Sequence, residues 1–400
     1  MRSLCAFLSY FIIASSSVML TPGHTYGQQT NIDFYNGAFQ FDQDSSIDIP
    51  FSDSLSSTSI RRFYTQMDNG NYRSVIQSLL DYRATHQMND WLYYQLVRQT
   101  AQQMSAKFDN YARYTLYKWF LMTKSGFDAR LAYKDDQLIF YVKSDDDISD
   151  LPYFELNKGT YICLNYHDYG ELFDRKKQYT LVDIEVPGAT NGFSYKVTRL
   201  PDFAPQKYIE KEIEFKYNGK GYHFNVKVNE EVNDIFKNYP IVDFETYFNI
   251  PLSKQTYESL IPVLAKYTKK LSTEKGIDYI MRFTRYAFLY EDDRALYGQE
   301  KRMPPEQTLL NQASDCDDRA ALFFYLVKEI YNLPMIALRY PTHVTIAVQF
   351  KKPVGKSILY QGNYYSICEA TPQNENLGIG QLAKKHQAED FEIVYHYTPH

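Results

Sequence analysis

The chain has 400 residues, of which 44% are hydrophobic and 23% are charged. These fractions are typical of a globular protein. The chain is longer than a single domain usually is, so we expect more than one domain. The formal net charge of −5 at pH 7 provides no basic field, which argues against nucleic acid as a partner.

The first 27 residues predict a secretory signal peptide. Arg2 precedes an apolar run over residues 4–20, and the Thr25-Tyr26-Gly27 step has small residues, Thr25 and Gly27, at the positions that a signal peptidase reads. We therefore expect cleavage near Gln28 and an exported protein, in the periplasm, in the cell envelope or outside the cell. An uncleaved membrane anchor is the alternative, and no later stretch predicts a transmembrane segment.

Removal of the signal leaves the cysteines Cys163, Cys316 and Cys368. These are too few for a disulfide scaffold, and their spacing is not that of a structural zinc site. We therefore predict no bound metal and no cofactor. A disulfide between Cys163 and Cys368 stays open as an alternative.

The first half of the chain predicts a linker followed by a mixed domain. Residues 28–58 are polar, rich in Asp and Ser and without a sustained period, which indicates a linker. Residues 59–170 form the first predicted domain. It is helical to about residue 124, and short strands follow within 129–143 and 160–164.

The middle of the chain changes character. Residues 171–250 contain alternating β-prone segments around the hairpin-turn signal Asn218-Gly219, and we interpret them as a small β-rich module. Residues 251–400 return to helices and then to strands. They form the last predicted domain, which carries the candidate chemistry.

Cys316 is the candidate nucleophile. Ser314 or Asp315 is a good helix N-cap, so Cys316 is expected in the first turn of a helix. There the helix dipole favours a thiolate, whereas the neighbouring Asp317 and Asp318 oppose it. The sequence leaves this balance open.

Two further groups follow in the order that a catalytic triad needs. His343 opens the alternating strand 344–350, and Glu369 follows an apolar strand over 364–368. A carboxylate beside an imidazole holds it in the tautomer that takes the thiol proton. We therefore predict a triad of Cys316, His343 and Glu369.

These motifs resemble the transglutaminase-like (papain-like cysteine protease) superfamily. The similar segments are Ser314-Asp315-Cys316, His343-Val344, Glu369-Ala370-Thr371-Pro372 and the stretch from Tyr297-Gly298 to Leu309. The resemblance runs from about residue 253 onward and departs from the family in having Ser314 for Gly and Glu369 for Asp. It implies an α+β fold with a papain-like core, in which a helix bearing the cysteine packs on an antiparallel sheet. For the oxyanion, the Cys316 backbone N–H is the first predicted donor, and Gln299 or Tyr297 is a candidate for the second.

The predicted reaction is attack of the Cys316 thiolate on an amide carbonyl of a protein or peptide. Resolution of the acyl-enzyme by water makes a peptidase or amidase, which we favour. Resolution by an amine makes a transglutaminase-type crosslinker. The rival from another class is a non-catalytic binding or scaffold protein with a vestigial triad. The sequence does not indicate an oligomeric state.

An internal duplication is a further hypothesis. One constant offset carries residues 109–142 onto residues 315–348, through a helix and into a strand. The first copy has Asn110 in the place of the cysteine and Gln137 in the place of the histidine. It is therefore predicted to be a degenerate transglutaminase-like copy.

Overall fold

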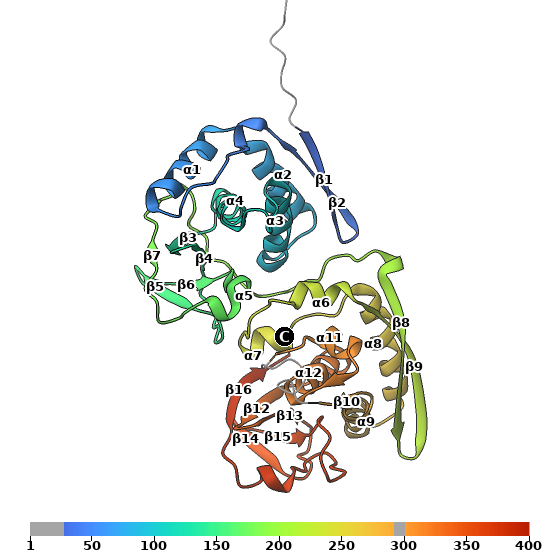
Figure 1. The fold of residues 1–400 in the computed structure, drawn as a ribbon. Coiled ribbons are helices and arrows are strands. Elements are labelled where there is room, and N and C mark those ends of the chain that lie inside the picture. The colour runs from blue at the N-terminus through green and yellow to red at the C-terminus, as the bar shows by residue number, and fades with distance from the viewer. Residues whose placement is uncertain (1–27, 292–300, 400) are drawn as a thin grey trace, which may run out of the picture.

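The computed structural model describes residues 28–291 and 301–399 and confirms an α+β protein built from helices and antiparallel sheets. Figure 1 shows an N-terminal unit in blue to green beside a C-terminal unit in yellow to red, with α6 (Glu231–Phe236) and α7 (Phe244–Phe248) between them. The Trp91 indole N–H donates to the Ile235 carbonyl at 2.9 Å across this junction. In the described parts of the chain, no helix is long and apolar enough to cross a bilayer.

The N-terminal unit begins with β1 (Gln28–Phe34), β2 (Gly37–Gln43), α1 (Ser57–Asn69), α2 (Arg73–Thr85), α3 (Asp90–Met104) and α4 (Tyr111–Lys124). Its sheet consists of β3 (Ala129–Lys134), β4 (Gln137–Lys143), β5 (Tyr153–Leu156), β6 (Gly159–Cys163) and β7 (Thr180–Leu181), with α5 (Tyr166–Tyr169) after β6. The helices before residue 124 and the strands within 129–143 and near 160–164 confirm the sequence prediction.

The linker predicted over residues 28–58 is wrong for its first part, because β1 and β2 form an antiparallel pair that packs on the helices and is not a loose arm. Ile32, Phe34, Phe39 and Phe41 are buried, and they alternate with the Asp and Gln residues that face solvent. The two strands pack on α2 and α3. Polar residues dominate the composition of this segment, so its alternating apolar residues were not recognised as two strands.

The C-terminal unit contains α8 (Lys254–Thr268), α9 (Thr273–Tyr286), β10 (Leu289–Tyr290), α11 (Pro305–Leu310), β11 (Ala313–Ser314) and α12 (Cys316–Tyr331). Its large sheet consists of β12 (Met335–Tyr340), β13 (His343–Gln349), β14 (Ser357–Tyr360), β15 (Asn363–Cys368) and β16 (Glu392–Tyr397). The predicted helix at Cys316 and the predicted strands that bear His343 and precede Glu369 are confirmed.

The β-rich module predicted over residues 171–250 does not stand alone. Its hairpin, β8 (Tyr208–Tyr217) and β9 (Lys220–Asn229), turns at Asn218 and Gly219 as predicted. Its apolar face lies on α8 and α9 of the C-terminal unit, where the Phe215 ring is 5.5 Å from that of Phe283. A two-stranded hairpin with one apolar face needs a cover, and the two amphipathic helices provide it.

Within the described residues, two five-stranded sheets share one strand order. The order is β5-β6-β4-β3-β7 in the N-terminal unit and β14-β15-β13-β12-β16 in the C-terminal unit. In each unit a long helix directly precedes the sheet. Asn110 is the N-cap of the first of these helices, and Asp315 is the N-cap of the second. The structure therefore aligns Asn110 with Asp315, whereas the sequence comparison aligned it with the next residue, Cys316. Duplication stays a prediction, and the shared strand order supports it.

Candidate functional site

The three predicted triad residues come from neighbouring elements of the C-terminal unit. Cys316 is the first residue of α12, His343 is the first residue of β13, and Glu369 directly follows β15. Because β13 and β15 are adjacent strands, the histidine and the glutamate meet at one end of the sheet. The helix α12 packs on β13.

His343 and Glu369 form a buried pair. Nε2 of His343 lies 2.7 Å from Oε2 of Glu369, and the two side chains are 4% and 0% exposed. The other carboxylate oxygen of Glu369 accepts the Thr371 backbone N–H at 2.8 Å. Burial raises the pKa of Glu369, but His343, the Thr371 hydrogen bond and Arg285 outweigh it, so this pKa lies below its ordinary value.

Two aspartates cap the start of α12. The Asp315 carboxylate accepts the Asp318 backbone N–H at 3.2 Å, and the Asp318 carboxylate accepts the Asp315 N–H at 3.3 Å. Asp318 is fully buried and also accepts the Tyr247 hydroxyl and the Met303 N–H. This reciprocal capping fixes the backbone on which Cys316 stands.

The surroundings of Cys316 raise the pKa of its thiol. Burial raises its pKa well above the ordinary value, Asp317 and Asp315 raise it further, and a hydrogen bond from the Val344 N–H lowers it by less. The thiol donates to Oδ1 of Asp317 at 3.4 Å. In the described part of the chain no hydrogen bond joins the thiol to the His343 ring. Burial and the two carboxylates thus oppose the thiolate in this geometry.

Sequence reasoning missed two arginines at this site. Arg302 forms an ion pair with Asp317, with 3.5 Å between Nε and Oδ2. Its guanidinium also stacks on Phe244, 4.1 Å from the centre of the ring. Arg319 is fully buried on α12, three residues after the cysteine. A basic residue on the apolar stripe of a helix was the available signal for Arg319, whereas nothing in the local sequence indicated Arg302.

The oxyanion candidates Gln299 and Tyr297 lie outside the described residues. Cys316 itself lies at the helix start, where a backbone N–H has no intrahelical acceptor.

Two cavities lie beside the candidate site. One of about 580 Å³ lies between Tyr290, the segment after Glu369 and the residues before His386. A second cavity, of about 240 Å³, is lined by Arg302 and Phe244 and by Asp147 and Ser149 of the N-terminal unit.

A loop from Pro372 to Phe391 encloses the histidine side of the site and depends on one glycine. Gly380 has φ +73°, and a Cβ there would lie 2.0 Å from the Val354 carbonyl oxygen. We expect Gly380→Ala to lower the free energy of unfolding by about 2–4 kcal/mol, measured by urea denaturation. The matched control is Gly362→Ala, which has φ +80° and open space around it and should cost about 1–2 kcal/mol. Equal losses would show that the contact with Val354 is unimportant.

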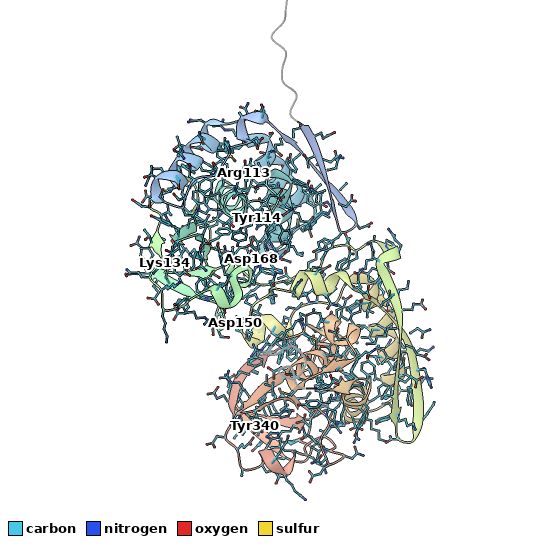
Figure 2. The ribbon with its side chains drawn as sticks, in the orientation of Figure 1. Arg113, Tyr114, Lys134, Asp150, Asp168 and Tyr340 are labelled. Atoms are coloured by element: carbon cyan, nitrogen blue, oxygen red, sulfur yellow. The ribbon has the colours of Figure 1, made fainter. Side chains whose placement is uncertain are left out.

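The corresponding part of the N-terminal unit holds structural groups instead of a triad. Asn110 caps α4 and donates to the Phe51 carbonyl at 2.5 Å, and Gln137 donates to the Leu172 carbonyl at 2.9 Å. Nearby, the amine of Lys118 is buried 3.9 Å from the carboxylate of Asp168, which Figure 2 labels. The cysteines Cys163, Cys316 and Cys368 are free, so the disulfide that the sequence left open does not form.

Lys118 gives a pH-dependent prediction. Burial, only partly offset by Asp168, lowers its pKa to about 7 in the folded protein. Because its pKa in the unfolded chain is higher, the unfolded state binds the extra proton above pH 7, and stability should rise with pH from this residue by up to about 1.4 kcal/mol per unit. Lys118→Met should remove this rise between pH 7 and 8 in urea denaturation. Identical slopes in both proteins would contradict the assignment.

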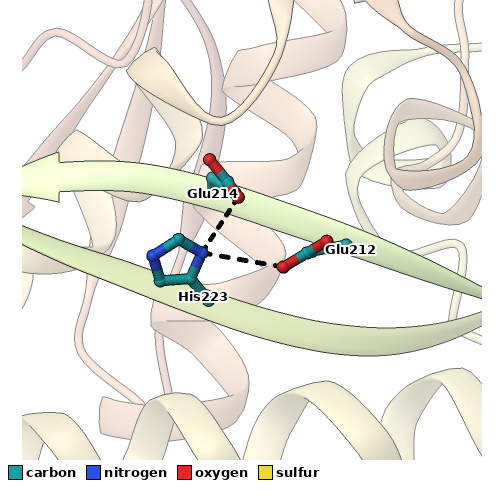
Figure 3. A group of neighbouring side chains, drawn as sticks. All are labelled: Glu212, Glu214 and His223. Atoms are coloured by element: carbon teal, nitrogen blue, oxygen red, sulfur yellow. Dashed lines mark hydrogen bonds and ion pairs between the residues drawn. The ribbon is translucent and has the colours of Figure 1, made fainter.

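The residues that could hold a metal ion lie elsewhere. Figure 3 shows His223 of β9 between Glu212 and Glu214 of β8, with Nδ1 at 3.7 Å and 3.0 Å from their carboxylates. All three side chains are more than 60% exposed. Cross-strand ion pairing accounts for this arrangement without a metal. Comparison of the sequence with protein-family models and with curated proteins gives no match.

Proposed function

We propose that this protein is an exported cysteine-dependent acyl-transfer enzyme with a transglutaminase-like, papain-like core. The observation that carries the proposal is the buried His343–Glu369 pair at 2.7 Å, at the end of the sheet on which the Cys316 helix packs. A peptidase or amidase acting on a protein or peptide is the favoured form. A glutamine crosslinking enzyme is the variant in which an amine replaces water.

The proposed reaction begins with the Cys316 thiol. Glu369 accepts a hydrogen bond from the Nε2–H of His343, and this tautomer leaves Nδ1 as the basic ring atom. Nδ1 takes the thiol proton as sulfur bonds to the amide carbonyl carbon. The carbon–nitrogen bond then breaks, and the amine leaves with the proton from His343. Water attacks the thioester with help from the same imidazole and releases the acid and the thiol.

The pH dependence of Cys316 alkylation tests this proposal. Iodoacetamide labelling, read by peptide mass spectrometry, should show a Cys316 that reacts at pH 7 in the wild type and at least about tenfold more slowly in His343→Ala. The buried Cys163 and Cys368 serve as internal controls. If Cys316 labels at the same rate in the wild type and in His343→Ala, the histidine does not serve the thiol and the enzyme proposal fails.

A binding function is the second candidate, and one observation favours it. A cavity of about 450 Å³ lies on the outer face of the N-terminal sheet, with the aromatic rings of Tyr141, Phe154 and Tyr179 in its wall and Arg175 and Lys177 at its edge. Such rings with basic neighbours suit a peptide or a sugar that carries an acidic group. Loss of alkylation at Cys316 together with retained peptide binding at this cavity would favour this second reading.

A further inference from the structure

A second imidazole–carboxylate pair lies directly on the first. The rings of His343 and His386 are 4.6 Å apart between centroids and only 6° from parallel. Nδ1 of His386 lies 2.5 Å from Oε2 of Glu389. His386 belongs to the short turn η4 (Lys384–His386), so the ring reaches the site from the loop and not from the sheet.

This second pair is buried. His386 is 2% exposed, and its Nε2 has no hydrogen-bond partner in the described structure. Tyr340 of β12 lies 5.5 Å from the His386 ring and 6.4 Å from the His343 ring. The outer edge of this group is formed by Phe391, whose ring is 5.5 Å from that of Tyr340. Ordinary packing would place an apolar side chain here, because a buried ring nitrogen without a partner is costly.

The charged and titratable groups around His386 are few. Its own segment contributes Glu389, β13 contributes His343, and the residue after β15 contributes Glu369. From β12 comes Tyr340, whose pKa burial raises to about 12, with Glu369 and Glu389 adding to the rise. The lysines at 384 and 385 are exposed, and the first of them pairs with Glu375 at 3.4 Å.

We propose that His386 is a positioning residue for His343, whose imidazole plane it holds through the parallel ring stack. The inference rests on the proposed function for its consequence at Cys316. Glu369 holds His343 at one ring nitrogen, and His386 lies flat on one face of the same ring. Glu389 in turn holds His386 at its Nδ1.

The primary test measures His343 itself and needs no substrate. Imidazole resonances of His343 in the full chain would be compared by NMR in the wild type, in His386→Phe, which keeps a flat ring, and in His386→Ala, which removes it. The His343 ring should give one sharp set of resonances in the wild type and in His386→Phe, and broadened or doubled resonances in His386→Ala, because only the second variant removes the ring that lies on His343. Sharp, single His343 resonances in His386→Ala would overturn the inference.

Cys316 alkylation supplies the second readout and separates the two proposals. His386→Phe should retain most of the wild-type rate at pH 7.5, whereas His386→Ala should lose at least about tenfold, since the supporting ring is gone. Asp390→Asn, which changes a neighbouring exposed carboxylate outside the stack, is the matched control and should keep the wild-type rate. If His343→Ala labels at the wild-type rate while the NMR difference persists, the proposed function fails and the positioning of His343 by His386 stands. A wild-type labelling rate in His386→Ala would overturn the positioning role.

Discussion

Asp317→Asn should speed the alkylation of Cys316 at pH 7 by about tenfold, because each unit by which a thiol pKa falls toward neutral multiplies its thiolate fraction by ten. After burial, Asp317 is the largest contribution that raises the pKa of this thiol. The carboxylate also accepts the thiol hydrogen bond. Its replacement removes a negative charge and leaves the Arg302 guanidinium, 3.5 Å away, without this partner. Both changes favour the thiolate.

The measurement is the pseudo-first-order rate of iodoacetamide labelling between pH 6 and 9, resolved by peptide mass spectrometry. Asp317→Glu is the matched control, since it retains the charge and should stay within about threefold of the wild type. A rate in Asp317→Asn equal to that of the wild type would mean that burial alone holds the thiol protonated. Faster labelling of Asp317→Asn would show that the Asp317 charge raises the pKa of the Cys316 thiol.

Arg319→Met should lower the free energy of unfolding by about 3–5 kcal/mol, the range for removing one partner of a buried charged network. The Arg319 side chain is fully buried, and its guanidinium donates to backbone carbonyls that converge on it. These carbonyls belong to Thr284, Arg285, Phe288, Leu289 and Ser314. Methionine fills much of the volume but leaves the carbonyl oxygens without donors. Urea denaturation of the full chain would measure the loss.

The residue that the duplication hypothesis pairs with Arg319 offers the matched control. Arg113, labelled in Figure 2, stands at the same sequence offset in the N-terminal unit and is 20% exposed. It donates to the Ile49 carbonyl at 2.7 Å and also pairs with Asp48. Water can replace some of these bonds, so Arg113→Met should cost about 1–2 kcal/mol. A loss at Arg319 no larger than that at Arg113 would show that the buried carbonyls find other partners.

The parts of the fold that sequence reasoning predicted are those with a local signal. An acidic cap followed by a long apolar stripe predicted a helix at Cys316, and alternation predicted the strands after His343 and before Glu369. Asn218 and Gly219 adopt positive φ at the hairpin turn, as that residue pair favours. The order of elements then placed His343 near Glu369, because neighbouring strands bring their ends together.

The remaining features depend on contacts between distant segments. His386 meets His343 from 43 residues further along, and no local pattern marks that approach. Arg302 reaches the site through its contacts with Phe244 and Asp317, which come from different elements. The hairpin at residues 28–43 was missed because each strand buries only two large side chains among polar ones. Sequence alone also could not weigh burial against the helix dipole at Cys316.

The position of β16 has a consequence for the order in which the chain matures during synthesis. This strand pairs with β12, which itself pairs with the His343-bearing strand β13, although almost fifty residues separate β16 from that histidine. The N-terminal sheet, by contrast, is complete once residue 181 has emerged. An emerging chain can therefore finish its first sheet early, while the sheet beneath the candidate site keeps an unpaired β12 edge until residue 397 is made. During that interval the exposed backbone groups along this edge of β12 can pair with a strand of another chain, which makes the edge a site of aggregation.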